Sequence, residues 1–600
     1  MRPLFYAKEK SRTTPLIYHA WDTETDGLGG LLLCITACVN APENVALFDG
    51  PNAISRFLDF ALCAPFAKRK KHVWISHNMS YDVRYIVEYI LRHRDEWRIK
   101  ALGLRTAAQF WHMDFEHMET GLVLRFVDSF AVFPRKLEEF AAQFGGAYKK
   151  LGGIDFEKER FNIDNPLHID YAKRDAAALL VSMRNYAQQV YEDYGVDLGY
   201  TASGTSLKAW QRTLHSSNKF WKPTRKANVF FRKAYYGGIV FLTDTSAFEN
   251  CTTYDINSSY PAQMRKGLPG GQYAQTYEYI RSNERPGFYR CKVKASENLL
   301  IPIIPRRDKK GVLRWSRGEF ETVCTNLEID FARKHGYEIE TYEGIIFDGY
   351  IYPANDYIDL CEKIRKENKG TPREAVAKLM QNGLYGKWGT ADLRDEIAIH
   401  YDLSDEEYSA LINEWTQLDD TPDCVFWTRK TDQYDDVTSI VQWAAWITAQ
   451  GRITLLDAAY KIGPENVLYG DTDSLTIKSG ADISSIAVSD AYGDFKHEKT
   501  WSSFRAIAPK TYAGEINGTY KGASKGQRKS KMKEREYQEI FENGSTEVEA
   551  DQLESLRQVL KKGYVTEAKK QSRVTSDICN ALGYRLLSNG KLELREAGDE

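Results

Sequence analysis

Two acidic residues stand close together near the start of the chain, in the stretch WDTETDG. Asp22 and Glu24 are two positions apart at the end of a predicted strand, so both side chains point to the same face. Paired carboxylates in that arrangement can hold Mg²⁺ or Mn²⁺, because these hard cations prefer oxygen ligands. A surface turn is the alternative, since acidic residues before Asp-Gly are common in turns.

Two further acidic positions follow in the same region. Asp82 comes after the apolar run VWI, within HNMSYD, and Asp175 lies four positions after Tyr171 on one face of a predicted helix. Either one alone is also typical of an ordinary strand end or helix surface. Three carboxylate sites at the ends of predicted elements fit a phosphodiester hydrolase in which two metal ions, ~4 Å apart, clamp the attacking and leaving oxygens.

A second acidic set lies in the middle of the chain. Asp255 ends a β-rich run in TTYDINSSYP, and VLYGDTDSLTI places Asp471 and Asp473 two positions apart between apolar strands, with Gly470 permitting a tight bend. A buried strand does not bring two carboxylates to its tip unless a cation or a hydrogen-bond network offsets their desolvation. The pattern therefore favours metal binding over a surface hairpin.

Between these acidic sites, EAVAKLMQNGLYG predicts a helix with a mixed polar face. Lys378, Asn382 and Tyr385 fall at positions i, i+4 and i+7, which places them on one side of the helix. This set suits a nucleotide, with the lysine for phosphate and the tyrosine for stacking on a base or packing on the sugar. Lys366, twelve positions before Lys378, is a second candidate phosphate contact, and a solvated lysine is its alternative reading.

Two shorter motifs add weaker signals of ligand contact. In YYGG, which begins at Tyr235, Gly237 and Gly238 would let a backbone lie close to a ligand. In PKTY, Lys510 and Tyr512 offer a charge and an aromatic ring.

The elements that must position these residues belong to a large mixed chain. It has 600 residues, of which 42% are hydrophobic and 27% charged, so we expect a globular protein of roughly four folding units. The first ~195 residues alternate short apolar runs with amphipathic stretches, which is typical of α/β structure. Strands and helices mix from Tyr235 onward.

Composition excludes several classes of protein. The nine cysteines are odd in number and scattered, so a disulfide framework is not expected. No apolar run approaches the ~18 residues that span a bilayer, and the N-terminus lacks the apolar segment of a signal peptide. The net charge of −2 predicts no general attraction for polyanions. One basic stretch, which is a solvated face or a nucleic-acid contact, holds Lys521, Lys525, Arg528, Lys529, Lys531, Lys533 and Arg535.

In their order along the chain, these motifs resemble those of family B DNA polymerases, and specifically the protein-primed branch of small phages and linear plasmids. DTET, HNMSYD and YAKRD are similar to the three exonuclease motifs of that family, and DINSSYP, KLMQNGLYG and YGDTDS to its polymerase motifs A, B and C. AYYGG and KTY are similar to its linker and primer-gripping motifs. The resemblance extends from about residue 16 to 530.

The resemblance implies a multidomain fold, α/β and α+β, in which an RNase H-like exonuclease domain precedes a palm, fingers and thumb with two insertions. We place the exonuclease domain at 1–195, linker and palm with motif A at 196–264, the first insertion (terminal-protein region 1) at 265–355, fingers with motif B at 356–388, the second insertion (terminal-protein region 2) at 389–436, palm with motif C and KTY at 437–512, and thumb and C-terminal segment at 513–600.

The resemblance also implies roles for individual residues. The proofreading metals would be held by Asp22, Glu24, Asp82 and Asp175, with Tyr171 orienting the attacking water. The polymerase metals would be held by Asp255 and Asp473, assisted by Asp471. The incoming nucleotide would be surrounded by Tyr260, Lys366, Lys378, Asn382 and Tyr385. The DNA contacts would be Thr25, Asn78, Tyr81, Ser129, Phe130, Tyr235, Gly237, Gly238, Lys510 and Tyr512.

Two positions depart from the family pattern. Motif B usually has serine where Gly383 stands, which predicts a looser contact with the minor groove of DNA. A catalytic lysine usually lies just before a glycine ahead of the third exonuclease motif, but KKLGGIDF has leucine there. Lys150 is the candidate substitute.

The implied activity is that of a template-directed DNA polymerase with a 3′–5′ exonuclease, which replicates a linear genome from a terminal-protein primer. It would use Mg²⁺ or Mn²⁺ in two-metal sites in both domains, and its partners would be template and primer DNA, dNTPs and the terminal protein. We expect a monomer without membrane contact, in the cytoplasm of the host cell. The alternatives are a family B polymerase that uses nucleic-acid primers or none, and a nuclease or nucleic-acid-binding protein with a decayed palm.

The two insertions carry the expectation of protein priming. The first contains basic and aromatic residues suited to a protein partner: Arg281, Tyr289, Arg290, Arg306, Arg307 and Trp315. The second is acidic around Asp405, Glu406 and Glu407, so we expect it to close around the template as a clamp rather than bind phosphate along that face.

Overall fold

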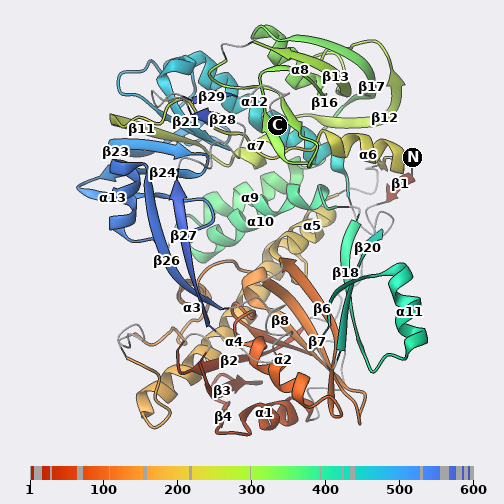
Figure 1. The fold of residues 1–600 in the computed structure, drawn as a ribbon, viewed down its shortest axis with the longest axis vertical. Coiled ribbons are helices and arrows are strands. Elements are labelled where there is room, and N and C mark those ends of the chain that lie inside the picture. Colours follow the sequence, from red (N-terminus) through yellow and green to blue (C-terminus); the bar gives the residue numbers. More distant parts are fainter. Residues whose placement is uncertain are drawn as a thin grey trace.

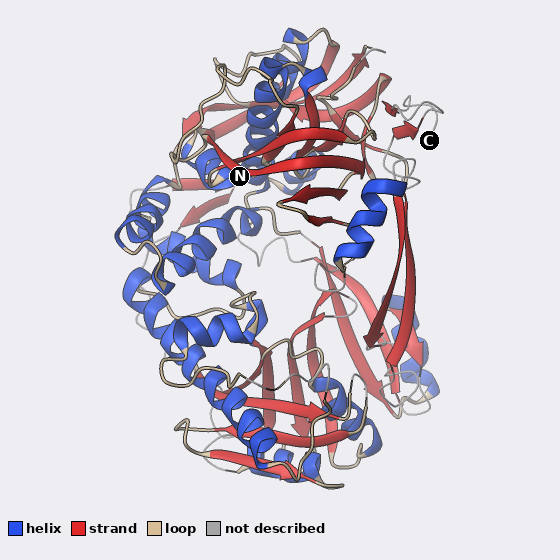
Figure 2. Cartoon of the chain, turned by 90° about the vertical axis from the view of Figure 1, so that its left-hand side faces the viewer, coloured by secondary structure: helices blue, strands red, loops and turns tan. Residues whose placement is uncertain are grey.

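The computed structural model covers the whole chain and describes all residues except 1, 6–15, 28–29, 64–71, 107–108, 153, 155–158, 215–218, 297–298, 392, 421–423, 433–438, 528–531, 554–566, 576–583, 587–591 and 595–600. Two large sheets lie toward opposite ends of the molecule, with a layer of helices between them on one side (Figures 1 and 2). The two acidic sets predicted from the sequence lie on different sheets.

The first large sheet is built from residues 17–128. Its strand order is β4 (Val45–Asp49), β3 (Leu32–Cys38), β2 (Ile17–Thr25), β5 (His72–Ser76), β8 (Val123–Asp128), β7 (Gln109–His117) and β6 (Trp97–Thr106). The three central strands β2, β5 and β8 run parallel, so their carboxyl ends meet at one edge of the sheet. Asp22 and Glu24 lie in the last half of β2, at that edge.

Both faces of this sheet are covered, which explains the apolar runs in its central strands. Trp21 and Trp74 face α1 (Ala53–Leu62) and α2 (Val83–Arg92), whereas their neighbours Ala20 and Ile75 belong to the core shared with α3 (Leu137–Phe144) and α4 (Pro166–Tyr194). The long helix α4 begins with Asn165 as its N-cap and ends at Gly195, which has a positive φ. It carries Tyr171 and Asp175 against β2.

The second large sheet is entirely antiparallel. Its order is β10 (Val240–Leu242), β21 (Val467–Asp471), β22 (Ser474–Ile477), β11 (Phe248–Ile256), β23 (Phe495–Ala508), β24 (Thr511–Ile516) and β25 (Thr519–Ala523). The helices α7 (Ser259–Arg265) and α12 (Val441–Ile462) pack against one another, and α12 also contacts β21 and β22. The chain therefore brings β11 next to the β21–β22 hairpin from more than two hundred positions away.

Residues 268–351, within the predicted first insertion, form a separate antiparallel sheet. Its order is β12 (Leu268–Thr276), β17 (Glu338–Ile351), β13 (Gly287–Ala295) and β16 (Gly318–Thr325), with the hairpin of β14 (Pro305–Arg307) and β15 (Leu313–Trp315) and the helix α8 (Asn326–Lys334). The predicted fingers that follow are two helices, α9 (Asn355–Glu367) and α10 (Pro372–Trp388), which pack on α5 (Ala202–Thr213).

The predicted second insertion is a three-stranded sheet that rests on the first domain. It comprises β18 (Leu393–Tyr401), β19 (Thr416–Asp420), β20 (Cys424–Asp432) and the exposed helix α11 (Asp405–Glu414). Phe426 is buried in the same core as the strands of the first sheet, and the Tyr401 hydroxyl accepts a hydrogen bond from Ile99 N at 3.2 Å. Figure 1 shows β18 and β20 beside β6.

The described part of the C-terminal region is small. It contains α13 (Glu534–Asn543), the hairpin of β26 (Ser545–Leu553) and β27 (Glu567–Thr575), and the short pair β28 (Tyr584–Leu586) and β29 (Leu592–Leu594). Of the basic stretch predicted from the sequence, Arg528, Lys529 and Lys531 lie outside the described residues. Among the described helices, none is both long and apolar enough to cross a membrane.

Candidate active sites

Four carboxylates meet at the edge of the first sheet. They come from β2, from the residue before α2 and from α4: Asp22, Glu24, Asp82 and Asp175. Asp82 is held by two hydroxyl donors, Thr23 Oγ1 at 2.5 Å and Ser76 Oγ at 2.7 Å, which come from two neighbouring strands. The sequence predicted all four carboxylates, and the structure brings them together.

The electrostatics of this cluster are those of buried acids whose negative charge is only partly offset. Burial, followed by the charges of Asp82, Glu24 and Asp175, holds the pKa of Asp22 well above its usual range. Burial and the neighbouring Asp175 raise the pKa of Glu24 to about 8, and burial raises that of Asp82 to about 6 despite its hydroxyl donors. Burial raises each of these pKa values, repulsion from neighbouring carboxylates adds to it at Asp22 and Glu24, and a bound cation would relieve both effects.

Lys150 is the one positive group that the structure places in this cluster among the described residues. Its Nζ lies 2.7 Å from Asp175 Oδ2 and 5.1 Å from the centre of the Tyr171 ring. The other oxygen of that carboxylate, Asp175 Oδ1, is buried and has no hydrogen-bond partner. The candidate substitute for the missing motif lysine therefore reaches the acidic site, although its position in the sequence differs.

The predicted contacts to a DNA 3′ end surround the cluster in two groups. Thr25 Oγ1 and the Tyr81 hydroxyl lie 2.5 Å apart, on the glycine-rich side of β2. Asn78 has a left-handed backbone (φ 66°), and its N–H donates to Asp128 Oδ1 at 2.9 Å. Phe130 N–H donates to the same oxygen, at 2.9 Å. The sequence did not single out Asp128, whose carboxylate shapes this loop.

Ser129 does not fit its predicted role as a DNA contact. Its side chain is fully buried, and its hydroxyl donates to the Ser76 carbonyl at 2.9 Å. His77 Nδ1 lies 3.0 Å from the same hydroxyl. Ser129 therefore holds the end of β5 in place and has no surface to offer to a strand of DNA.

A second acidic site lies where β11 meets the β21–β22 hairpin. Ile256 N–H, next to Asp255, donates to the Asp473 carbonyl at 2.7 Å, so the backbone fixes the two acidic residues beside each other. Thr472 adopts a left-handed conformation (φ 60°) that makes the tight turn between Asp471 and Asp473 possible. Gly470 packs on Phe241, where a Cβ atom would lie 2.4 Å from the ring, so its role is close packing as well as the bend.

Burial, Asp473 and Glu498 raise the pKa of Asp255 to about 7. Burial and Asp471 raise that of Asp473 to about 6. Glu498, on β23 next to β11, was not predicted from the sequence because it is one acid within a charged strand, KHEK. Because its charge raises the pKa of both Asp255 and Asp473, Glu498 is a fourth acidic residue of the site.

Tyr260 and Tyr385 stack on one another beside this acidic site. Their ring centres are 4.2 Å apart and their planes differ by 26°. Lys378 and Asn382, on the same helix α10, are exposed, and the charge of Lys378 lowers the pKa of Asp255, which places it near that carboxylate. Lys366 is separate from this group: its side chain is 74% exposed, and Nζ lies 2.6 Å from Glu362 Oε1.

The YYGG and KTY motifs flank the same turn. A Cβ atom at Gly238 would lie 2.8 Å from the Thr472 side chain, so glycine is required for the backbone to pass this close. Gly237 is exposed, and the Tyr235 ring packs on Gly389 at the end of α10. Lys510 Nζ donates to Asp471 Oδ1 at 2.8 Å. Tyr512 packs against Tyr469, with ring centres 5.2 Å apart.

Three residues expected to meet a priming protein are unsuited to it. Tyr289 and Trp315 are buried in the core of the 268–351 sheet, and Arg306 is buried with Nε donating to Ser316 Oγ at 2.9 Å. Arg307 is exposed, but it donates to the Tyr235 carbonyl and lies over the Tyr236 ring. Arg281 and Arg290 remain on the surface.

The donor chemistry of both acidic sites fits divalent cations, although the side chains are not arranged as finished ligand sets. Within the described ranges, no three His, Cys, Asp or Glu side chains converge closely enough to hold a metal ion as they stand. In each site one carboxylate forms an ion pair with a lysine: Asp175 with Lys150, and Asp471 with Lys510. A hard cation would neutralise the clustered carboxylates and would give Asp175 Oδ1, which has no hydrogen-bond partner, a ligand to bind.

Comparison with known families decides the assignment. Residues 157–457, half of the chain, match the family described as DNA polymerase type B, organellar and viral. The chain belongs to this family. The resemblance inferred from the motifs is therefore confirmed at the level of the type B family.

Individual relatives of this type B chain are fungal and viral. It is 27% identical over 380 residues to a probable DNA polymerase of Neurospora intermedia, covering 60% of this chain and 38% of the relative. It is 26% identical over 487 residues to the DNA polymerase of Bacillus phage phi29, covering 73% of this chain and 77% of the relative. The chain thus spans well under half the length of the fungal relative.

Solved structures support the fold of this type B chain. Phi29 DNA polymerase complexed with primer-template DNA and incoming nucleotide substrates is similar, with a TM-score of 0.72, 18% identity, and coverage of 94% of this chain and 100% of that one. The predicted fold class, a multidomain α/β and α+β chain of family B type, is confirmed by this similarity.

The glycine that departs from the family's motif B has a packing role. A Cβ atom at Gly383 would lie 2.5 Å from Ser206 Oγ and 3.2 Å from the Ser203 Cα atom, both on α5. Gly383 therefore faces the neighbouring helix and lets α5 and α10 approach closely. The prediction that this position contacts the minor groove is not supported by its location.

We expect Gly383→Ala to destabilise this type B chain by ~1–3 kcal/mol, because the added methyl group overpacks the α5–α10 contact. Thermal or denaturant unfolding measures the loss. Ser206→Ala in the same chain removes the Oγ atom and should restore part of it, whereas Gly386→Ala, where nothing lies within 4 Å, is the matched control. Equal effects at Gly383 and Gly386 would contradict the packing role.

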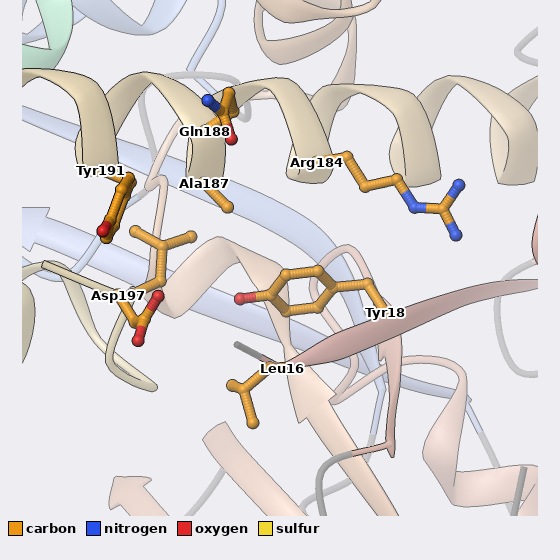
Figure 3. A pocket seen from close by; sticks show the side chains of 8 residues that line it. Leu16, Tyr18, Arg184, Ala187, Gln188, Tyr191 and Asp197 are labelled. Atoms are coloured by element: carbon orange, nitrogen blue, oxygen red, sulfur yellow. The ribbon is translucent and has the colours of Figure 1, made fainter. Parts of the chain in front are cut away.

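A pocket lies away from both acidic sites of this type B chain. It opens between the start of β2 and α4 and is lined by Tyr18, Arg184 and Asp197 among others (Figure 3). Its volume, about 170 Å³, is below the ~300–1,000 Å³ of typical ligand pockets. None of the residues predicted to carry chemistry lines it, so we do not place a substrate there.

Proposed function

We propose that this chain is a template-directed DNA polymerase with a proofreading 3′–5′ exonuclease, which replicates a linear genome from a terminal-protein primer. The observation that carries the polymerase is the Ile256–Asp473 backbone hydrogen bond, which holds the acids of two distant motifs side by side next to the Tyr260–Tyr385 stack. A relative described with primer-template DNA and nucleotides supports those substrates here.

In polymerisation, Asp255 and Asp473 would hold the cations, and Asp471, paired with Lys510, would assist. Lys378 would meet the phosphates, and the stacked tyrosines would lie under the sugar. When bound in either acidic site, two divalent cations supply the charge stabilisation of an in-line displacement at phosphorus. The chain's own contribution is to place primer and nucleotide with the reacting atoms ~3–3.5 Å apart.

In proofreading, the four carboxylates around Asp22 would hold the cations, with Lys150 and Tyr171 beside them. Lys150 keeps its charge next to Asp175, because ion pairing outweighs burial and holds the pKa of the lysine above its usual range. A cation there can stabilise negative charge that develops on the phosphate. Tyr171 would orient the attacking water, and Thr25, Asn78, Tyr81 and Phe130 would hold the 3′ end.

Extension of a labelled primer–template with dNTPs and Mg²⁺ tests the proposal. We expect template-dependent extension, and degradation of single-stranded DNA from the 3′ end when dNTPs are left out. Degradation without extension would favour the alternative of a nuclease with a decayed palm. The close placement of Asp255 and Asp473 argues against that alternative.

We expect Tyr260→Val to reduce discrimination against ribonucleotides by about tenfold or more, equivalent to ~1.4 kcal/mol. The Tyr260 ring, held by its stack on Tyr385, would clash with a 2′-hydroxyl, so selectivity comes from repulsion of the wrong sugar. Single-nucleotide insertion of dNTP and rNTP by the same variant measures the ratio. Unchanged sugar discrimination would remove Tyr260 from this role.

Priming by a protein requires an amino-acid hydroxyl to take the place of a primer 3′-OH. The separate sheet of residues 268–351 is a candidate surface for the priming partner, and the second insertion, fixed to the first domain through Phe426 and Tyr401, is suited to close around the template. A family B polymerase that uses nucleic-acid primers is the second candidate. A covalent protein–nucleotide product distinguishes the two.

We expect Arg281→Glu with Arg290→Glu to impair labelling of the priming protein at least several-fold while sparing extension of a DNA primer. Arg281 is exposed in the loop between β12 and β13 and Arg290 is exposed on β13, unlike the buried Arg306. Radiolabelled dNTP, genome-end template and the partner protein supply the assay. Arg56→Glu with Arg92→Glu, at two exposed arginines of the first domain, is the charge-matched control. Equal loss on both primers would assign the arginines to DNA.

A further inference from the structure

Two neighbouring cations on α9 point to different surroundings. Lys366 faces solvent and pairs with Glu362 of its own helix. Arg365 is half-buried and turns toward the second sheet, because adjacent positions on a helix lie on different faces. The sequence makes Lys366 a candidate phosphate contact and leaves a solvated lysine as the alternative.

The contacts of Arg365 are all with uncharged groups. Its Nη1 donates to the Ser258 hydroxyl at 2.9 Å, to the Tyr492 hydroxyl at 2.7 Å and to Gln381 Oε1 at 3.3 Å. Its Nε is buried without a partner, and its guanidinium lies over the Tyr492 ring, 5.5 Å from the ring centre. Three elements thus fix the side chain without neutralising it.

Arg365 differs in this respect from three other cations in or near the two sites. Lys150 pairs with Asp175, Lys510 with Asp471, and the buried Arg452 with Glu328. Within the described part of the chain, Arg365 has no carboxylate in salt-bridge distance. A partly desolvated cation without an anion is costly, so a negative ligand at this position would be stabilised.

The location of Arg365 identifies which ligand would supply the charge. Ser258 follows Asp255 by three positions, and Gln381 lies one helical turn after Lys378 on α10. Arg365 and Lys378 therefore flank the turn that leads away from the carboxylates. A triphosphate whose α-phosphate lies beside Asp255 would extend its terminal phosphate along this turn.

We propose that Arg365 binds the γ-phosphate of the incoming nucleotide, so that the enzyme selects triphosphates over diphosphates. Ser258, Gln381 and Tyr492 hold Nη1 and Nε is buried, so Nη2 is the nitrogen that would donate a charge-assisted hydrogen bond to a phosphate oxygen. This inference rests on the proposed polymerase function and adds to it a residue that sets substrate specificity.

The test compares the affinities of dNTP and dNDP for a complex with a primer terminated by a dideoxynucleotide, measured by displacement of a fluorescent nucleotide. We expect Arg365→Gln to weaken dNTP binding by about 10-fold to 100-fold and dNDP binding by less than about threefold, since one charge-assisted contact is worth ~1.5–3 kcal/mol. Arg365→Lys keeps the charge but loses the second nitrogen, which Ser258, Gln381 and Tyr492 hold in place, so it should retain part of the preference. Lys363→Gln, exposed on the same helix, is the control.

Three results would overturn the proposal. Equal weakening of dNTP and dNDP would make Arg365 a structural link between α9 and the second sheet. Selective loss of dNTP binding in Lys366→Gln instead would assign the phosphate contact to the lysine. If Arg365→Gln does not fold, a folded Arg365→Lys variant that weakens dNTP and dNDP binding equally would have the same meaning. Wild-type protein that binds nucleotides but does not extend primers would refute the polymerase function. The affinities for dNTP and dNDP could still be compared in that case.

Discussion

Replacing Asp22 and Glu24 by alanine should lower 3′–5′ degradation of single-stranded DNA by at least about a thousandfold and leave nucleotide addition nearly intact. The two carboxylates lie on β2 of the first sheet, whereas Asp255 and Asp473 lie on the second. Loss of two metal ligands removes several kcal/mol of charge stabilisation, and each ~1.4 kcal/mol is a factor of ten in rate. Timed gels of a labelled oligonucleotide, without and with dNTPs, measure both activities.

The control for this double variant is Asp26→Ala, a neighbouring acid that is 40% exposed and pairs with Arg160 at 3.0 Å. It should retain both activities. A folded Asp22/Glu24 variant that loses polymerisation as well would show that the two acidic sets do not act separately.

The acidic sites were predictable because their chemistry imposes spacing. Asp471 and Asp473, two positions apart at the tip of a buried strand, are costly without a cation. Asp22 and Glu24 alone also fit a surface turn, and they indicate a metal site only together with Asp82 and Asp175. The pairing of β11 with β22 could not be derived from periodicity, because more than two hundred residues separate them. The ordered resemblance to a known family supplied that placement.

Side-chain direction was predicted less well. In β13, the stretch YRCKVKA alternates buried and exposed positions, so Tyr289 faces the core and Arg290 faces solvent. That alternation was present in the sequence and would have excluded Tyr289 as a partner contact. Arg306 and Arg307 also point apart within the short strand β14, one buried and one exposed.

Contacts between distant helices had no signal in one sequence. From the sequence alone, Gly383 is only a departure from a family motif. The structure shows that α5 packs against it and that Ser206 fills the space a side chain would need. Lys150 likewise reaches Asp175 through the loop before α4, a path that spacing does not reveal. In both places the role of the residue follows from a contact between segments that are separated in the sequence.

The largest loss of polymerisation should come from Asp473→Asn. Asn keeps the shape of the side chain but removes the charge that would hold a cation, so we expect nucleotide addition to fall by at least about a thousandfold, ~4 kcal/mol, with the exonuclease unchanged. Asp471→Asn should cost less, because Asp471 is engaged by Lys510 and the Tyr469 hydroxyl. Glu249→Gln, exposed on β11, is the control. Single-turnover rates of nucleotide insertion compare the three variants. A slower rate for Asp471→Asn than for Asp473→Asn would mean that Asp471, rather than Asp473, is the main metal ligand.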